Sequence, residues 1–128
     1  MIRLVSFGRL TRQKNYPVVL EALSNVSSLG KWRYEIYGSG EDRVLLDELI
    51  QRFSLDQRVV IYDFTDDIHE IMQCADCLIF PSNWEGMPNV LVEAAALGMP
   101  AIVSNIPANG YALQEWKDNF YWFDPRDT

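Results

Sequence analysis

The chain has 128 residues, of which 48% are hydrophobic and 23% charged, so its size and composition are those of one globular domain rather than two. Its 18 acidic and 11 basic residues give a formal net charge of −7, which argues against nonspecific binding to nucleic acid or to an anionic membrane surface. No apolar run reaches the ~18 residues of a membrane span, and the first ten residues lack the apolar core and cleavage site of a signal peptide. We therefore expect a soluble, cytoplasmic protein that binds no nucleic acid.

Apolar runs of strand length alternate with segments of helical period along the whole chain, a pattern typical of α/β proteins. The pattern predicts strands over residues 2–7, 34–37, 59–64, 77–81, 101–104 and 119–123. It predicts helices over residues 16–26, 41–53, 66–74, 88–97 and 111–116. Because parallel strands are joined by right-handed crossovers, we expect a Rossmann-like, doubly wound parallel sheet of about six strands in the order 3-2-1-4-5-6, with helices on both faces. In that order the first and fourth strands are neighbours, and ligands bind at the loops that follow them, residues 8–15 and 82–87.

Two cysteines, Cys74 and Cys77, have the C-x-x-C spacing found in redox and metal sites. A structural zinc site takes four ligands, and the single histidine, His69, leaves that set incomplete. A thioredoxin-like pair opens a helix after a strand, whereas this pair lies between the end of a predicted helix and the start of a strand. We expect two small buried residues here.

The loop after the first predicted strand is locally basic in an acidic chain. Arg9, Arg12 and Lys14 lie within six residues, and no acidic residue precedes Glu21. Gly8 allows a ligand to approach the backbone closely, an arginine can donate two hydrogen bonds to phosphate oxygens, and a lysine adds a point charge. At this edge of the sheet the composition favours an anion site, the alternative being a solvated basic loop that pairs with surface acids.

The helix predicted after the fourth strand carries one charged side chain. From Gly86 to Gln114, Glu93 is the only Asp, Glu, Lys, Arg or His residue, and its apolar neighbours predict a helix that is buried nearly all round. A buried carboxylate needs hydrogen-bond donors, which ligand hydroxyls or the backbone of a neighbouring loop would supply. Glu85 precedes the helix, and the rise of ~7.5 Å from Pro88 to Glu93 lets the two carboxylates contact different parts of one elongated ligand.

Three features bear on phosphate binding. Free N–H groups at the start of the same helix, around Met87, Asn89 and Val90, suit a phosphate. The G-x-G at residues 38–40 follows a predicted strand, but Arg43 stands where a dinucleotide-binding G-x-G-x-x-G motif needs its third glycine. The sequence contains no G-x-x-x-x-G-K-[ST] phosphate loop.

Five short motifs follow one another along the chain: Gly8-Arg9-Leu10 with Lys14, Gly38-Ser39-Gly40, Ala75-Asp76, Pro81-Ser82, and an E-x7-E segment from Glu85 to Glu93. In these motifs and their order the chain resembles the C-terminal, nucleotide-sugar-binding half of the retaining glycosyltransferases of family four, also called group one, which have the GT-B fold. The resemblance covers nearly the whole chain.

The resemblance implies a set of catalytic and donor-binding residues. Arg9 and Lys14 would hold the donor diphosphate and Glu85 would contact the donor sugar, which makes these three the catalytic set. Glu93 would bind the ribose hydroxyls. The other donor-binding residues that the resemblance implies are Gly8, Gly38, Gly40, Ser82, Gly86, Met87, Pro88, Asn89 and Val90, with the backbone near the last two at the phosphates.

For the complete enzyme, the resemblance implies transfer of a hexose from a nucleoside diphosphate sugar to an acceptor hydroxyl with retention, in polysaccharide, lipopolysaccharide or glycoconjugate biosynthesis. It implies no metal and no cofactor. Its partners would be the nucleotide-sugar donor and an acceptor glycan or lipid, bound through an N-terminal GT-B domain that is absent from this chain. The complete enzyme would be cytoplasmic and peripheral to the inner membrane face. We expect residues 1–128 to be a single donor-binding domain that binds the donor weakly and transfers no sugar alone.

Two positions depart from the family pattern. Ala112 stands where many relatives carry an acid, and Phe120 stands where a glycine is common. A noncatalytic Rossmann-like binding or partner module therefore remains an alternative, and it would show no response to nucleotides. A different nucleotide-using α/β enzyme would prefer NAD or ATP to nucleoside diphosphates.

Overall fold

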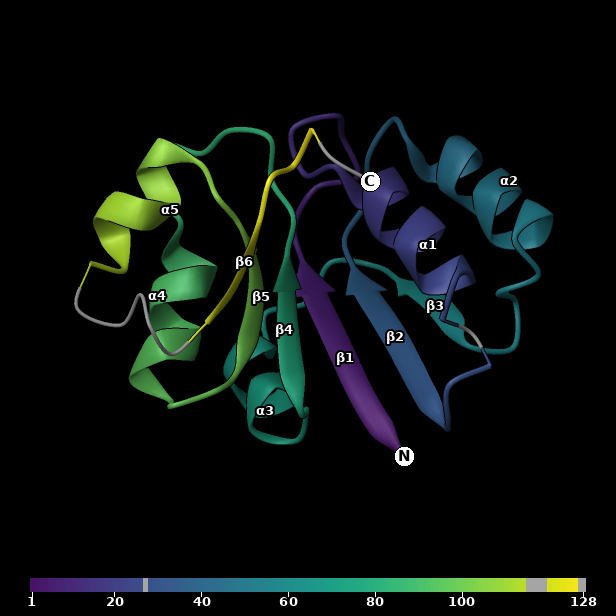
Figure 1. Ribbon diagram of the computed structural model, residues 1–128, viewed down its shortest axis with the longest axis horizontal. Helices are drawn as coiled ribbons and strands as arrows, with labels where there is room; N and C mark the ends of the chain where they lie inside the picture. Colours follow the sequence, from purple (N-terminus) through teal and green to yellow (C-terminus); the bar gives the residue numbers. More distant parts are fainter. Residues whose placement is uncertain (27, 115–119, 127–128) are drawn as a thin grey trace.

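Six parallel strands form one sheet in the order β3-β2-β1-β4-β5-β6 (Figure 1). The structure is a computed structural model that describes residues 1–26, 28–114 and 120–126. The strands are β1 (Ile2–Phe7), β2 (Trp32–Tyr37), β3 (Val59–Tyr62), β4 (Cys77–Phe80), β5 (Ala101–Ser104) and β6 (Tyr121–Phe123). The helices are α1 (Tyr16–Ser24), α2 (Arg43–Arg52), α3 (Ile68–Gln73), α4 (Asn89–Ala96) and α5 (Pro107–Ala112). The predicted doubly wound sheet and its strand order are confirmed.

Helices cover both faces of the sheet, so the molecule has two apolar cores (Figure 1). One core lies under α1 and α2 and contains Leu20 and Leu46. The other lies under α3 and α4 and contains Met72 and Leu91. Both faces are apolar because successive strand residues point to opposite sides and a parallel sheet is covered on each. In the described part of the chain, no helix is long and apolar enough to cross a bilayer.

The neighbouring strands β1 and β4 place two loops at one edge of the sheet. Leu4 lies opposite Cys77 and Val5 opposite Leu78 in a parallel register. Both strands therefore end at the same edge, and the loops that follow them meet there. This is the position predicted for a ligand site in a doubly wound sheet.

Helix α5 lies earlier in the chain than predicted. It spans Pro107–Ala112 rather than residues 111–116, and predicted positions 115, 116 and 119 lie outside the described residues. Pro107 occupies the first turn, where a helix loses nothing by the missing N–H. Asn109 and Gly110 are weak helix formers. Helix propensity therefore gives no signal for α5, in which Asn109 is fully buried.

One of the two cysteines predicted to be buried is exposed. Cys74 follows the last residue of α3, a short helix whose buried contact with the core is made by Met72, and the thiol of Cys74 lies at the surface. Cys77 in β4 is partly buried, and burial raises the pKa of its thiol to about 11. Both thiols are free.

Candidate functional site

Hydrogen bonds join the loop after β1 to the loop after β4. The backbone N–H of Asn83 donates to the carbonyl of Gln13 at 2.8 Å, and the Asn83 side chain donates to the carbonyl of Arg12 at 2.8 Å. The Asn15 side chain donates to the carbonyl of Pro81 at 3.1 Å. The two loops therefore form one connected edge, as the strand order predicts.

A buried ion pair lies where these loops meet. Lys14 Nζ is 2.7 Å from Oε2 of Glu85, and the side chains are only 18% and 7% exposed. The hydroxyl of Ser82, itself fully buried, donates to the same Oε2 at 2.7 Å. Lys14 Nζ also lies 5.8 Å from the centre of the Phe80 ring. Oε1 of Glu85 has no hydrogen-bond partner within the described part of the chain, so it is available to a donor from a ligand.

A pocket of about 290 Å³ opens beside this pair, and we call it the strand-end pocket. It is lined by Phe7, Gly8, Arg9, Lys14, Tyr37, Gly38, Ser39, Phe64, Thr65, Ile68 and Val90. Arg9 and Lys14 are its only charged lining residues, and Arg9 is exposed with no side-chain partner among the described residues. The pocket therefore combines positive charge with an aromatic and apolar wall, which suits an anionic ligand that carries a ring system.

Two glycines are needed where the loops after β1 and β2 cross. A Cβ on Gly38 would lie 1.9 Å from the carbonyl oxygen of Gly8, and a Cβ on Gly40 would lie 2.5 Å from that of Leu10. These close contacts accompany hydrogen bonds that link the loops, including one from Leu10 N to the carbonyl of Ser39 at 2.9 Å. Gly8 and Gly38 line the strand-end pocket, whereas Gly40 packs on Leu10 outside it.

The predicted burial of Glu93 is wrong. Helix α4 buries Leu91, Ala94 and Ala95, while Glu93 and Asn89 are exposed. Alanines do not define a buried face, because their high helix propensity and small size suit exposed positions as well. The side chain of Glu93 has no hydrogen-bond partner in the described ranges, so it is accessible to solvent and to a ligand.

Other predicted residues lie on the opposite side of α4. Gly86, Met87 and Pro88 line a groove of about 630 Å³, which we call the α4–α5 groove, together with Val92, Pro107, Ala108, Tyr111 and Ala112. Val90 alone, of the residues at the start of α4, lines the strand-end pocket. Six of the ten predicted donor-binding residues thus line one or the other of these two hollows. The other four, Gly40, Ser82, Asn89 and Glu93, line neither.

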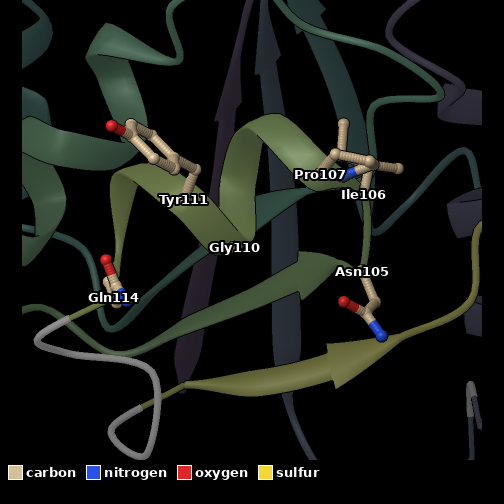
Figure 2. Close-up of a pocket in the computed structure, with 6 residues that line it drawn as sticks. All are labelled: Asn105, Ile106, Pro107, Gly110, Tyr111 and Gln114. Carbon is tan, nitrogen blue, oxygen red and sulfur yellow. The ribbon is translucent and has the colours of Figure 1, made fainter.

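A further hollow of about 570 Å³ lies beside α5, and none of the described residues that line it is charged. Figure 2 shows its lining residues, with the amides of Asn105 and Gln114 at opposite ends of the helix and not directed at a common point. Its side chains therefore do not converge as those of a ligand site do. No group of three or more His, Cys, Asp or Glu residues is placed to hold a metal ion within the described ranges.

Comparison with known proteins identifies the family. The family described as "Glycosyl transferases group 1" matches residues 2–128. The chain belongs to the group 1 glycosyltransferases. The resemblance seen in its motifs is therefore confirmed.

Two relatives of this group 1 chain act in named biosynthetic reactions. The amylovoran biosynthesis glycosyltransferase AmsD of Erwinia amylovora is 35% identical over 100 residues, which are 78% of this chain and 28% of that protein. The UDP-Gal:α-D-GlcNAc-diphosphoundecaprenol α-1,3-galactosyltransferase of Escherichia coli is 32% identical over 120 residues, 88% of this chain and 30% of that protein. The chain thus spans less than a third of the length of these relatives.

Solved glycosyltransferases share the fold. Anabaena Alr3699/HepE in complex with UDP-glucose superimposes with a TM-score of 0.85 at 26% identity, over 97% of this chain and 35% of that one. TarM superimposes with a TM-score of 0.86 at 18% identity, over 97% of this chain and 25% of that one. The Rossmann-like, GT-B type of architecture predicted for this group 1 chain is confirmed.

Several residues of the strand-end pocket were not predicted from the sequence. Tyr37, Ser39, Phe64 and Thr65 line it from the ends of β2 and β3. Their position at the ends of neighbouring strands is a signal in the sequence, but the switch-point rule points only to the loops after β1 and β4. Tyr16 was also missed; its hydroxyl donates to the carbonyl of Gly8 at 3.3 Å, and burial raises its pKa well above the usual value.

Proposed function

We propose that residues 1–128 form the donor-binding domain of a retaining glycosyltransferase that transfers a hexose from a uridine diphosphate sugar to an acceptor hydroxyl. The observation that carries the proposal is the Lys14–Glu85 pair beside the exposed Arg9 at the sheet's switch point. It places two cations on the lining of a pocket of small-molecule size and a carboxylate in contact with one of them.

The two cations supply electrostatic stabilisation of the leaving group. A nucleoside diphosphate gains negative charge as the bond to the sugar breaks. Arg9 would donate two hydrogen bonds to phosphate oxygens. Lys14 would add a point charge from a site where it is held by Glu85, whose carboxylate also accepts from Ser82. We propose that these side chains replace a metal ion in this role, and that no cofactor takes part.

The carboxylates would bind hydroxyl groups of the donor. Oε2 of Glu85 is occupied by Lys14 and Ser82, so Oε1 is the atom that accepts a sugar hydroxyl. Glu93 is exposed on α4, about one and a half turns after Pro88, and would accept hydrogen bonds from the ribose hydroxyls. The N–H of Val90, which lines the strand-end pocket, would donate to the phosphates, whereas that of Asn89 donates to the carbonyl of Met87 at 2.9 Å.

The choice of uridine rests on relatives. The E. coli relative uses UDP-Gal by its name, and the Anabaena structure holds UDP-glucose. From the biosynthetic role in the name of the Erwinia relative, we also propose that the complete protein acts in the assembly of a surface polysaccharide or related glycoconjugate. A separate N-terminal domain would bind the acceptor glycan or lipid, so residues 1–128 alone would bind the donor weakly and transfer no sugar.

An amide NMR titration tests this function. The ¹⁵N-labelled chain is titrated with UDP, GDP, ADP and NAD. We expect saturable shifts with UDP over Gly8–Lys14 and Met87–Glu93, and we expect Glu93→Ala to weaken them. Arg9→Ala should weaken the binding of UDP by about tenfold or more, because a charge-assisted hydrogen bond is lost.

Arg12→Ala is the matched control. Arg12 belongs to the same loop, is exposed and does not line the strand-end pocket, so its loss should leave the affinity for UDP unchanged. Equal weakening by Arg9→Ala and Arg12→Ala would indicate a nonspecific basic loop. A well-dispersed spectrum without response to any nucleotide would contradict the proposal and favour the noncatalytic module.

A further inference from the structure

A chain of buried hydrogen bonds runs from α5 to the carboxylate of Glu85. Nδ2 of Asn109 donates to the carbonyl and to the hydroxyl oxygen of Ser104, at 3.1 and 3.2 Å. The Ser104 hydroxyl donates to the carbonyl of Ser82 at 2.7 Å, and the Ser82 hydroxyl donates to Oε2 of Glu85 at 2.7 Å. Asn109, Ser104 and Ser82 are all fully buried.

One polar atom of this network is unsatisfied. The Oδ1 atom of Asn109 is buried and has no hydrogen-bond partner among the described residues, which costs free energy. The carbonyl of Ser104 already accepts the backbone N–H of Ile106 at 3.0 Å. An apolar side chain of similar size at position 109 would satisfy the packing without an orphaned acceptor.

The donor and acceptor in each hydrogen bond explain how Asn109 affects Glu85. Because the Ser104 oxygen accepts from Asn109, its own hydrogen is directed to the carbonyl of Ser82. That contact anchors Ser82 near the start of the loop after β4, and the Ser82 hydroxyl then fixes Oε2 of Glu85. With Oε2 fixed by Ser82 and Lys14, the orientation of Oε1 is determined.

We propose that Asn109 is a positioning residue that acts through Ser104 and Ser82 to orient the Glu85 carboxylate toward the donor sugar. Its importance for donor binding rests on the proposed function of Glu85, whereas its effect on the geometry of the ion pair exists without any ligand. Asn109 thereby links α5 to Lys14 of the strand-end pocket through Glu85.

The test compares three single variants and the Asn109→Leu/Ser104→Ala double variant with the wild type. Asn109→Leu removes the amide and its orphaned oxygen, Ser104→Ala removes the hydroxyl, and Asn105→Leu is the control. Asn105 adjoins Ser104 but is exposed, and its side chain has no partner among the described residues. The readouts are hydrogen exchange of the Lys14 ammonium, the ¹³C shift of the Glu85 carboxylate, and the melting temperature.

We expect Asn109→Leu and Ser104→Ala to speed exchange of the Lys14 ammonium by about fivefold, the equivalent of one neutral hydrogen bond. The double variant should show no more than either single one, because both substitutions break the same chain. Asn109→Leu should melt at or above the wild-type temperature, and Asn105→Leu should match the wild type in all three readouts.

Ligand binding gives a separate result. Asn109→Leu should weaken UDP-glucose by about fivefold and UDP by less, because only the sugar contacts Oε1. Unchanged Lys14 and Glu85 signals in both Asn109→Leu and Ser104→Ala would overturn the positioning role. Failure of the wild type to bind either ligand would overturn the proposed function instead, since the signals of the free chain decide the positioning role independently.

Discussion

Replacing Lys14 with methionine isolates the energetics of the buried ion pair. The substitution keeps the apolar stem of the side chain but leaves the Glu85 carboxylate, 7% exposed, with Ser82 as its hydrogen-bond donor. Removing one partner of a fully buried pair costs about 3–5 kcal/mol, because the remaining charge loses its counter-ion, and a partly buried pair such as this one lies at the low end of that range. Since Lys14 is still 18% exposed, we expect a loss of about 3 kcal/mol in the free energy of unfolding.

A second substitution separates stability from ligand binding. In Lys14→Met with Glu85→Gln, the residue at position 85 is neutral and still accepts the hydrogen bond from Ser82, so stability should return to within about 1 kcal/mol of the wild type. Binding of UDP should not return, because both variants lack the ammonium group.

Urea unfolding followed by circular dichroism measures the first effect, and a UDP titration on the same samples measures the second. Lys31→Met is the matched control, since Lys31 is exposed and its side chain has no partner among the described residues. A loss below 1 kcal/mol for Lys14→Met, or a double variant as unstable as the single one, would refute the reasoning.

Three further predictions concern pH, thiols and metals. Burial opposes ionisation of Glu35, but hydrogen bonds from Arg3 and Tyr37 outweigh it and lower the pKa of Glu35 below 4.5. The ionised carboxylate therefore stabilises the folded state fully above about pH 4.5, and this stabilisation is lost as the pH falls through the lowered pKa. Glu35→Gln should reduce the fall in stability between pH 7 and pH 3, and an unchanged fall in urea unfolding would contradict this. At pH 8 Ellman's reagent should modify Cys74 at least about tenfold faster than Cys77, whose pKa is raised to about 11, and equal rates would exclude the difference in burial. EDTA should leave the affinity for UDP unchanged, because the pocket's own cations bind the diphosphate, and a loss restored by Mg²⁺ would show that a metal is required.

The error over Glu93 shows the limit of composition as a guide to burial. A helix rich in alanine and valine has no polar stripe, so the absence of charged residues predicts burial on nearly all sides. The sheet covers only the stripe of Leu91, Ala94 and Ala95. The neighbouring positions are left to solvent or to a ligand, and that outcome depends on which elements surround the helix.

Local chemistry in the sequence was enough for the strand order, the edge of the sheet that carries the site and the two cations of the first loop. These features follow from the period of apolar residues, from the handedness of crossovers and from charge within a few positions, which are all local properties. Only the tertiary structure shows that Lys14 pairs with Glu85, 71 residues away, that Oε1 of Glu85 has no partner in the described chain, and that Asn109 leads by buried hydrogen bonds to the same carboxylate. Such contacts depend on how the loops after β1, β4 and β5 pack against one another, and no local pattern encodes that packing.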